Sequence, residues 1–187
     1  MVSGGLWYHR AMDKKLIIFT DIGDTVIDEA SEARDVPFGV VLRAECIPGA
    51  REALLQLHRQ GYAIAMVADG LAASFHNTMA QNGLSHVFDA WIISETLNSQ
   101  KPAPEMFRAA MDALGLTDAD KGRVIMVGNN LERDIAGANR FGLRSVLLDW
   151  SPRYRHEPRC ADEIPDHVIH APWELVALAE RLNAELE

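Results

Sequence analysis

Acidic side chains follow two short apolar runs of this chain, and they are the groups best suited to chemistry. Asp21 and Asp24 come after residues 16–19, and Asp69 comes after residues 63–67. A carboxylate held at the end of a strand can attack phosphorus and form a covalent intermediate, which divides one difficult step into two. The alternative is that these carboxylates only cap the turns where the strands end.

Apolar runs that alternate with amphipathic segments position these side chains. The runs are too short for helices and are typical of buried strands in a parallel sheet. The expected strands are 16–19, 63–67, 91–93, 124–127 and 145–148, followed late in the chain by a short apolar piece at 168–169. The expected helices are 50–60, 71–82, 105–114, 132–141 and 173–186. This alternation predicts an α/β fold whose mainly parallel sheet is covered on both faces.

The ends of the expected strands indicate where a site would lie. Right-handed crossovers place the carboxyl ends of parallel strands at one edge of the sheet, and ligands bind in the crevice beyond that edge. Asp21, Asp69 and Asn129 are therefore expected to converge there, with Lys101 as a further candidate from a neighbouring loop. Gly23 would let the backbone come close to a ligand.

Length and composition fit one domain. The chain has 187 residues, of which 48% are hydrophobic, and a chain of this size can bury a core without disulfides or metals. We expect residues 14–187 to form that single domain and residues 1–13 to form an N-terminal extension outside it.

Charge and cysteine content narrow the class of partner and the compartment. The net charge of −9 and the pI of about 5.2 argue against nucleic acid or an anionic membrane as the partner. Two cysteines, Cys46 and Cys160, are too few for a disulfide framework and fit a reducing cytoplasm. The N-terminal segment lacks the apolar stretch of a signal peptide, and no run is long enough to span a membrane. A cytoplasmic protein is expected.

Three separated motifs of the chain belong together. They are Asp21 to Thr25, then Lys101-Pro102, then Gly128-Asn129 with Asp134, followed by Gly137-Ala138 and Gly142. In this combination they resemble the haloacid dehalogenase-like (HAD) hydrolase superfamily, and the resemblance runs from Leu16 to about Leu148. It implies a Rossmann-like three-layer α/β/α sandwich. It also implies cleavage of a small phosphorylated substrate through an aspartyl-phosphate, with Mg²⁺ as the cofactor.

The resemblance assigns roles residue by residue. Asp21 is the expected nucleophile, and Lys101 is expected to pair with it and with the phosphoryl oxygens. Mg²⁺ prefers oxygen ligands and keeps several waters, so it needs only a few protein groups. The expected metal ligands are Asp21, the carbonyl of Gly23, Asn129 and Asp134. The expected substrate-binding residues are Asp24, Thr25, Ala68, Asp69 and Gly70.

Three positions depart from the pattern of the superfamily's phosphatases. Gly23 stands where a second aspartate usually gives and takes a proton, Ala68 where Ser or Thr usually donates to the phosphate, and Asn129 where a metal-binding acid is usual. Without a proton donor at Gly23, the protein is expected to prefer substrates with good leaving groups and to accumulate its phosphoenzyme. Asp24, one residue along, is expected to hold the turn rather than to move a proton.

These departures leave a second hypothesis open, in which the chain is a non-catalytic HAD-like domain that binds a phosphorylated ligand or a protein. A carbon–halogen hydrolase is a more distant alternative, because such an enzyme would need an enclosed apolar pocket and a cap domain. Residues 28–48 hold only a short hairpin or flap, and residues 70–101 hold one helix and one strand. No cap domain is therefore expected. An open cleft suits a lid from another subunit, which would fit a homodimer.

The loop 150–159 gathers arginines, a histidine and two aromatic residues in an acidic chain. One interpretation is that it binds an anionic group of the substrate, since arginine suits bidentate anion recognition. The other is a solvated loop with Trp150 and Tyr154 packed beneath it.

Overall fold

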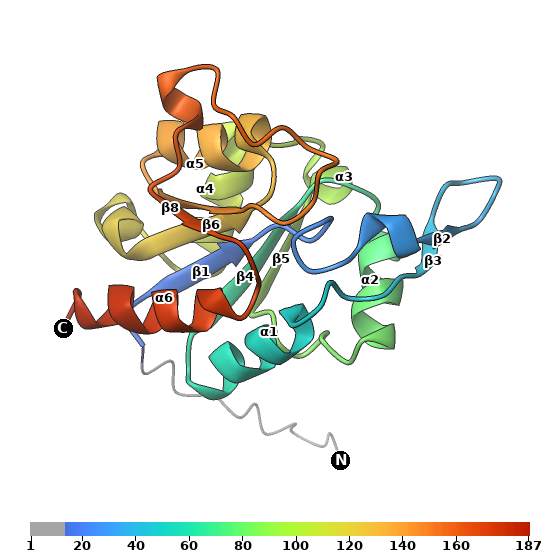
Figure 1. Cartoon of the computed structure of the whole chain (residues 1–187), viewed down its shortest axis with the longest axis horizontal. Coiled ribbons are helices and arrows are strands. Elements are labelled where there is room, and N and C mark those ends of the chain that lie inside the picture. The colour runs from blue at the N-terminus through green and yellow to red at the C-terminus, as the bar shows by residue number, and fades with distance from the viewer. Residues whose placement is uncertain (1–13) are drawn as a thin grey trace, which may run out of the picture.

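A parallel sheet of six strands forms the centre of the molecule in the computed structural model, which describes residues 14–187 (Figure 1). The strand order is β5-β4-β1-β6-β7-β8, and each neighbouring pair is parallel. The strands are β1 (Ile17–Thr20), β4 (Ala63–Ala68), β5 (Ala90–Ile93), β6 (Val124–Gly128), β7 (Arg144–Leu148) and β8 (His167–Ile169). Residues 1–13, for which the sequence predicts an extension, lie outside the described residues.

Helices cover both faces of the sheet and complete a three-layer α/β/α sandwich (Figure 1). One face is covered by α1 (Ala50–Arg59), α2 (Ala72–Gln81) and α6 (Glu174–Ala184). The other face is covered by α4 (Pro104–Ala113) and α5 (Ala136–Phe141). Shorter helical turns are η1 (Glu29–Ser31), α3 (Ser94–Leu97), η2 (Asp118–Arg123), η3 (Leu131–Ile135) and η4 (Ala161–Glu163).

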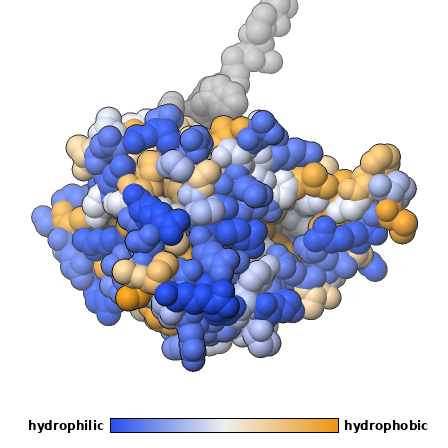
Figure 2. All heavy atoms as spheres, turned by 90° about the horizontal axis from the view of Figure 1, so that it is seen from above, coloured by the Kyte–Doolittle hydropathy of each residue, from blue (hydrophilic) through white to orange (hydrophobic). Residues whose placement is uncertain are grey.

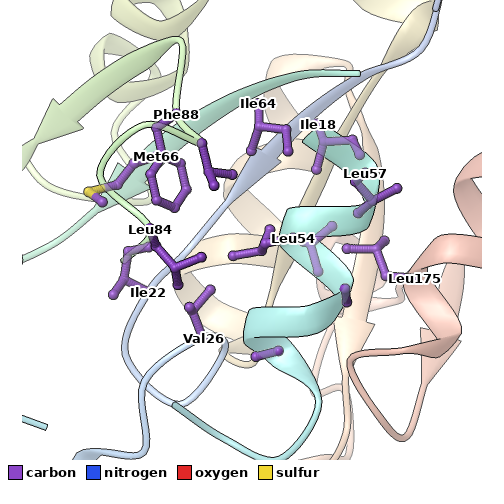
Figure 3. Packing of buried hydrophobic residues seen from close by; sticks show 14 of the residues in the cluster. Ile18, Ile22, Val26, Leu54, Leu57, Ile64, Met66, Leu84, Phe88 and Leu175 are labelled. Atoms are coloured by element: carbon purple, nitrogen blue, oxygen red, sulfur yellow. The ribbon is translucent and has the colours of Figure 1, made fainter. Parts of the chain in front are cut away.

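Side chains of β1 alternate between two apolar cores, as the period of a strand requires. Ile18 belongs to the core formed with α1 and α6, where Leu54, Leu57 and Leu175 also lie (Figure 3). Phe19 belongs to the opposite core, formed with α4 and α5. Burying one such side chain contributes roughly 1.5–3 kcal/mol. The strand that leads to Asp21 is therefore fixed from both faces.

A two-stranded hairpin is the main structure inserted between β1 and α1. It consists of β2 (Ala33–Arg34) and β3 (Val41–Arg43), which pair antiparallel. The backbone N–H of Val41 donates to Oγ of Ser74 over 2.9 Å, which ties the hairpin to α2. Figure 2 shows the hairpin projecting from the body with apolar residues at its end, and Val36 and Phe38 are 97% and 77% exposed.

The predicted strands and helices are confirmed except at the start of the helix expected at 132–141, and two elements add to them. The apolar piece at 168–169 forms the sixth strand, β8, because it pairs with β7 and because Asp166 accepts from the backbone N–H of Ser145 over 2.8 Å. The short helix α3 follows β5, where Ser94 accepts from the N–H of Gly70 and Glu95 from that of Ala72. These contacts are tertiary, so a local pattern does not predict them.

Two further expectations concern cysteines and membranes. Cys46 and Cys160 are both unbonded. Between residues 14 and 187, no helix combines the length and the apolar composition needed to cross a bilayer.

Candidate active site

The carboxyl ends of β1, β4 and β6 bring the predicted site residues to one edge of the sheet. β1 lies between β4 and β6, and the N–H of Asp21 donates to the carbonyl of Val127 over 2.9 Å, one residue beyond β1. The chain moves from β1 toward β5 and then returns to continue on the other side of β1 at β6. Such a reversal of direction opens a crevice where α/β proteins bind ligands.

The ammonium group of Lys101 joins two carboxylates in this crevice. Its Nζ lies 2.7 Å from Oδ1 of Asp21 and 2.7 Å from Oδ1 of Asp134. The Lys101 side chain is buried, and so is that of Asp134. Burial opposes the charge on Lys101, but the carboxylates of Asp134 and Asp21 raise its pKa above the ordinary value. The group is therefore a fixed positive charge at neutral pH.

The surroundings of Asp21 favour the neutral form of its carboxyl group. Burial raises the pKa of its carboxyl group, the charge of Lys101 opposes this shift, and the charge of Asp134 adds to it. One ammonium group therefore faces two buried carboxylates, and the three groups together carry a net negative charge when both carboxylates are ionised. This is the electrostatic condition under which a divalent cation would bind.

The loop that carries Lys101 is anchored by Asp69. Oδ1 of Asp69 accepts from the backbone N–H of Lys101 over 3.0 Å, and Oδ2 lies 3.5 Å from Nη1 of Arg133. Burial raises the pKa of Asp69, which the charge and the N–H of Lys101 partly offset. The N–H of the next residue, Gly70, donates to Ser94. The neighbouring Ala68 is fully buried and has only a methyl side chain.

A π-helical turn, η3, presents Asp134 to the cleft. Oδ1 of Asn130 caps it by accepting from the N–H groups of Glu132 and Arg133, both over 3.0 Å. Oδ2 of Asp134 in turn accepts from the N–H of Asn130 over 3.0 Å. The sequence predicts an ordinary helix at 132–141, and the structure corrects its first turn. Such π turns are frequent at functional sites, where they redirect side chains.

Gly128 is required by the position of Asp134. A Cβ atom on Gly128 would lie 2.2 Å from Oδ2 of Asp134, a distance that real contacts do not reach. The last residue of β6 therefore has to be glycine for the carboxylate to lie over the backbone.

Asn129 has a polar atom that lacks a partner. Its side chain is 4% exposed, and its Nδ2 is buried with no hydrogen bond to the described residues. Buried polar groups are nearly always satisfied, so this orphaned N–H donor indicates a missing acceptor, such as a water or an oxygen of a bound ligand. No set of three or more His, Cys, Asp or Glu side chains within residues 14–187 could hold a metal ion. The predicted donor set has two carboxylates and a neutral amide, which fits a Mg²⁺ that keeps several waters.

Asp24 and Thr25 do not join the cleft beside Asp21. The carboxylate of Asp24 is fully buried and forms an ion pair with Arg153. Asp24 also has φ of 48°, and its carbonyl accepts from Nε1 of Trp150 over 2.6 Å. Thr25 lies instead beside an apolar hollow between α1 and α6 that Leu54 lines. Asp24 therefore holds the turn, as expected from the sequence.

The arginines of the 150–159 loop are already paired. Arg153 contacts Asp28 over 2.7 Å in addition to Asp24. Arg155 contacts Glu163 over 2.7 Å and Glu132 over 2.8 Å. In this structure the loop stabilises the turn after β1, and its two paired arginines are not presented to the cleft as free cations.

Glu29 reaches the site although no motif or period in the sequence selects it. A Cβ atom on Gly23 would lie 2.2 Å from Oε1 of Glu29, so the carboxylate of Glu29 fills the space of a side chain at Gly23. The hydroxyl of Tyr154 donates to Oε2 of Glu29 over 3.1 Å. Burial raises the pKa of Glu29, and the charge of Asp24 adds to the shift. Only the folded turn brings these residues together.

Sequence comparison identifies the family to which these motifs belong. The family of haloacid dehalogenase-like hydrolases matches residues 6–142. The chain therefore belongs to the haloacid dehalogenase-like hydrolases.

Individual relatives agree with this fold. Glyceraldehyde 3-phosphate phosphatase of Methanopyrus kandleri is 33% identical over 129 residues, which are 69% of this chain and 54% of that protein. The chain spans about half the length of the first curated relatives it matches. The HAD-hydrolase YfnB of Bacillus subtilis, solved bound to magnesium, has a TM-score of 0.63 and 23% identity, covering 72% of this chain and 56% of that one. L-2-haloacid dehalogenase of Xanthobacter autotrophicus has a TM-score of 0.71 and 17% identity, covering 88% of this chain and 98% of that one.

Proposed function

We propose that this chain is a Mg²⁺-dependent phosphohydrolase that acts on a small phosphorylated substrate through an aspartyl-phosphate at Asp21. The observation that carries the proposal is the buried ammonium of Lys101, 2.7 Å from Asp21 and 2.7 Å from Asp134. A nucleophilic carboxylate and a phosphate repel each other, and a fixed cation between them reduces that repulsion. The phosphatase relative from Methanopyrus kandleri supports the same class of reaction.

The chain's own groups divide the proposed reaction into two steps. In the first, an oxygen of Asp21 attacks phosphorus and the bond to the leaving oxygen breaks. In the second, water attacks the same phosphorus and the Asp21 carboxylate is released with inorganic phosphate. Lys101 donates to Oδ1 of Asp21, which holds the carboxylate in place and leaves Oδ2 for the attack.

The metal would be held by oxygen atoms of the predicted ligands: Asp21, the carbonyl of Gly23, Asn129 and Asp134. Its chemistry there would be to neutralise charge on the phosphoryl oxygens and on the attacking carboxylate. Asn129 would offer its amide oxygen, while its unpartnered Nδ2 is a donor that would face a phosphoryl oxygen or a water rather than the metal. Because an amide is neutral, Mg²⁺ binding is expected to be weak.

A screen of phosphorylated metabolites tests the proposal. Triose phosphates belong in it, because of the Methanopyrus relative, beside sugar phosphates, phosphoserine and 4-nitrophenyl phosphate. Release of inorganic phosphate that needs both Mg²⁺ and Asp21 is the expected result. The Asp21→Asn variant keeps the shape of the side chain and removes the nucleophile, so it is the control for contaminating phosphatases.

The second candidate is a non-catalytic domain that binds a phosphorylated ligand or a protein. Ala68 and Asn129 favour it, because neither supplies the hydroxyl or the charge expected of an efficient site. Saturable binding of a phosphorylated compound without phosphate release would support this candidate instead. Homodimerisation and a cytoplasmic location stay predictions from the sequence.

A further inference from the structure

Cleavage of an alkyl phosphate needs a proton for the departing alkoxide. A positioned general acid contributes about a hundred- to ten-thousand-fold to such a step. Gly23 has no side chain, so the proton has to come from another group at the cleft.

Four carboxyl groups near the cleft are committed to other contacts. Asp21 and Asp134 share the ammonium of Lys101. Asp69 accepts from the backbone of Lys101, and Asp24 is buried in its ion pair with Arg153. Protonation of Asp21, Asp134 or Asp24 would weaken an ion pair of the site, and protonation of Asp69 would weaken its contacts with the Lys101 loop and with Arg133.

A further carboxylate nearby, Glu32, is paired with Arg34. Glu29 remains, and its carboxyl group lies where a side chain on Gly23 would begin. Oε1 of Glu29 lies 2.2 Å from the position of a Cβ atom on Gly23, and the next nearest atom, Cδ, lies 3.2 Å away. The carboxyl group of Glu29 can therefore occupy this space only because Gly23 has no side chain.

Two contacts hold Glu29 in this place. Its backbone N–H donates to Oδ1 of Asp24 over 3.0 Å, and its Oε2 accepts from the hydroxyl of Tyr154 over 3.1 Å. Asp24 is fixed in turn by Arg153 and by its hydrogen bond to Glu29. The turn after β1 and the 150–159 loop together position one carboxyl group.

The same carboxyl group faces a hollow of suitable size. A cavity of about 140 Å³ lies under the hairpin, and its wall includes Gly23, Glu29, Asp69 and Gly70. A cavity of this volume accommodates the carbon skeleton of a small alcohol rather than a large one. Glu29 therefore lies between the backbone that follows Asp21 and a space for the leaving group.

We propose that Glu29 is the general acid and base of this site, in place of a side chain at Gly23, and that the leaving group occupies the cavity under the hairpin. The proposal rests on the proposed phosphohydrolase function. It replaces the expectation from the sequence that the site lacks a proton donor.

The proton balance closes over the two steps. In the first step, Asp21 bonds to phosphorus, the phosphorus–oxygen bond to the leaving group breaks, and the departing oxygen takes the proton of the Glu29 carboxyl group. In the second step, the Glu29 carboxylate takes a proton from water as the water oxygen bonds to phosphorus. The bond between phosphorus and Asp21 breaks, inorganic phosphate leaves, and Glu29 is again protonated.

The proposal is tested by measuring the Glu29→Gln variant with two substrates whose leaving groups differ in their need for a proton. With a small alkyl phosphate, kcat is expected to fall about a hundred- to ten-thousand-fold. With 4-nitrophenyl phosphate, whose leaving group needs no proton, a burst of one nitrophenolate per site is expected, followed by slow turnover. Glu52→Gln, the same change on the exposed side of α1, should behave as the wild type with both substrates.

A rescue variant separates catalysis from folding. Gly23→Asp alone would collide with Glu29, whereas Gly23→Asp combined with Glu29→Ala places a carboxyl group in the vacated space. The double variant should recover alkyl-phosphate activity that Glu29→Ala alone lacks. Unchanged rates for Glu29→Gln on both substrates would overturn the role of Glu29 while leaving the hydrolase function intact. A wild type that cleaves neither substrate, even with Mg²⁺, would overturn both proposals.

Discussion

The buried ammonium of Lys101 lies 2.7 Å from Oδ1 of Asp21, although 80 residues separate the two in the sequence. The two residues come from different parts of the fold, since Asp21 follows β1 directly and Lys101 belongs to the loop before α4. The expected nucleophile and its cation are therefore brought together by the tertiary fold and not by a local segment.

Removing the cation should destabilise the protein as well as inactivate it. Lys101→Met leaves the buried carboxylates of Asp21 and Asp134 without their shared partner, and breaking a buried pair costs roughly 3–5 kcal/mol. Urea unfolding at neutral pH measures the loss. Lys121→Met is the matched control, because it breaks an ion pair with the exposed Asp118 and a cation–π contact with Phe141, each of which contributes about 1 kcal/mol or less. Equal losses in the two variants would contradict the burial of the Lys101 pair.

Gly128→Ala should displace Asp134. The added methyl group would lie 2.2 Å from Oδ2 of Asp134, so either the backbone or the carboxylate has to move. Overpacking of this kind costs roughly 1–3 kcal/mol, and phosphate release should fall with it. Gly122→Ala is the control, because a Cβ atom there would meet nothing within 4 Å. Thermal unfolding and activity should distinguish the two variants, and indistinguishable results would show that Asp134 is not held against Gly128.

Asn129→Asp should tighten Mg²⁺ binding. The variant adds a negative charge at the side chain whose amide nitrogen has no partner in the described structure. Coulomb attraction to a divalent cation then grows, and we expect titration calorimetry to show binding about tenfold tighter, or about 1.4 kcal/mol. Asn130→Asp is the control, since the side chain of Asn130 already caps η3. Unchanged or weaker binding would show that Asn129 does not contact the metal.

Arg153→Gln should leave Asp24 as an unpaired buried charge. Removing one partner of a buried polar contact costs roughly 1–3 kcal/mol, and Asp24 is fully buried. Combining the change with Asp24→Asn removes the charge and should restore most of the lost stability in a double-mutant cycle. Arg159→Gln, at a largely exposed side chain, is the control and should change the free energy of unfolding little. Additive losses in the cycle would mean that the two residues are not coupled.

The main features of the fold follow from local patterns in the sequence. Residues 16–19 and 63–67 are short apolar runs that end at acidic residues, so both the strands and the edge where they meet are predictable. The placement of Lys101 and Asp134 depends on the family resemblance, because no local pattern pairs residues so far apart. The strand β8 is too short to give a periodic signal.

Glu29 and Arg153 could not be predicted in the same way. Glu29 begins the short helical turn η1 and Arg153 lies in a loop, and in both places side-chain direction depends on tertiary contacts rather than on a period of 2 or 3.6 residues. The turn after β1, with Asp24 at φ of 48°, is what brings Glu29 beside Gly23. The π turn at η3 likewise begins at the cap formed by Asn130. The helical period of residues 132–141 predicts an ordinary α-helix there and gives no sign of the π turn.

The central claim is that Asp21 becomes phosphorylated during turnover. The most direct measurement is rapid acid quenching of the enzyme with Mg²⁺ and a substrate found in the screen. Borohydride then reduces an aspartyl-phosphate to homoserine, and peptide mass spectrometry locates it. Homoserine at position 21 in the wild type and no turnover by Asp21→Asn are the expected results. Phosphate release by Asp21→Asn at the wild-type rate, or turnover without modification of Asp21, would contradict the central claim.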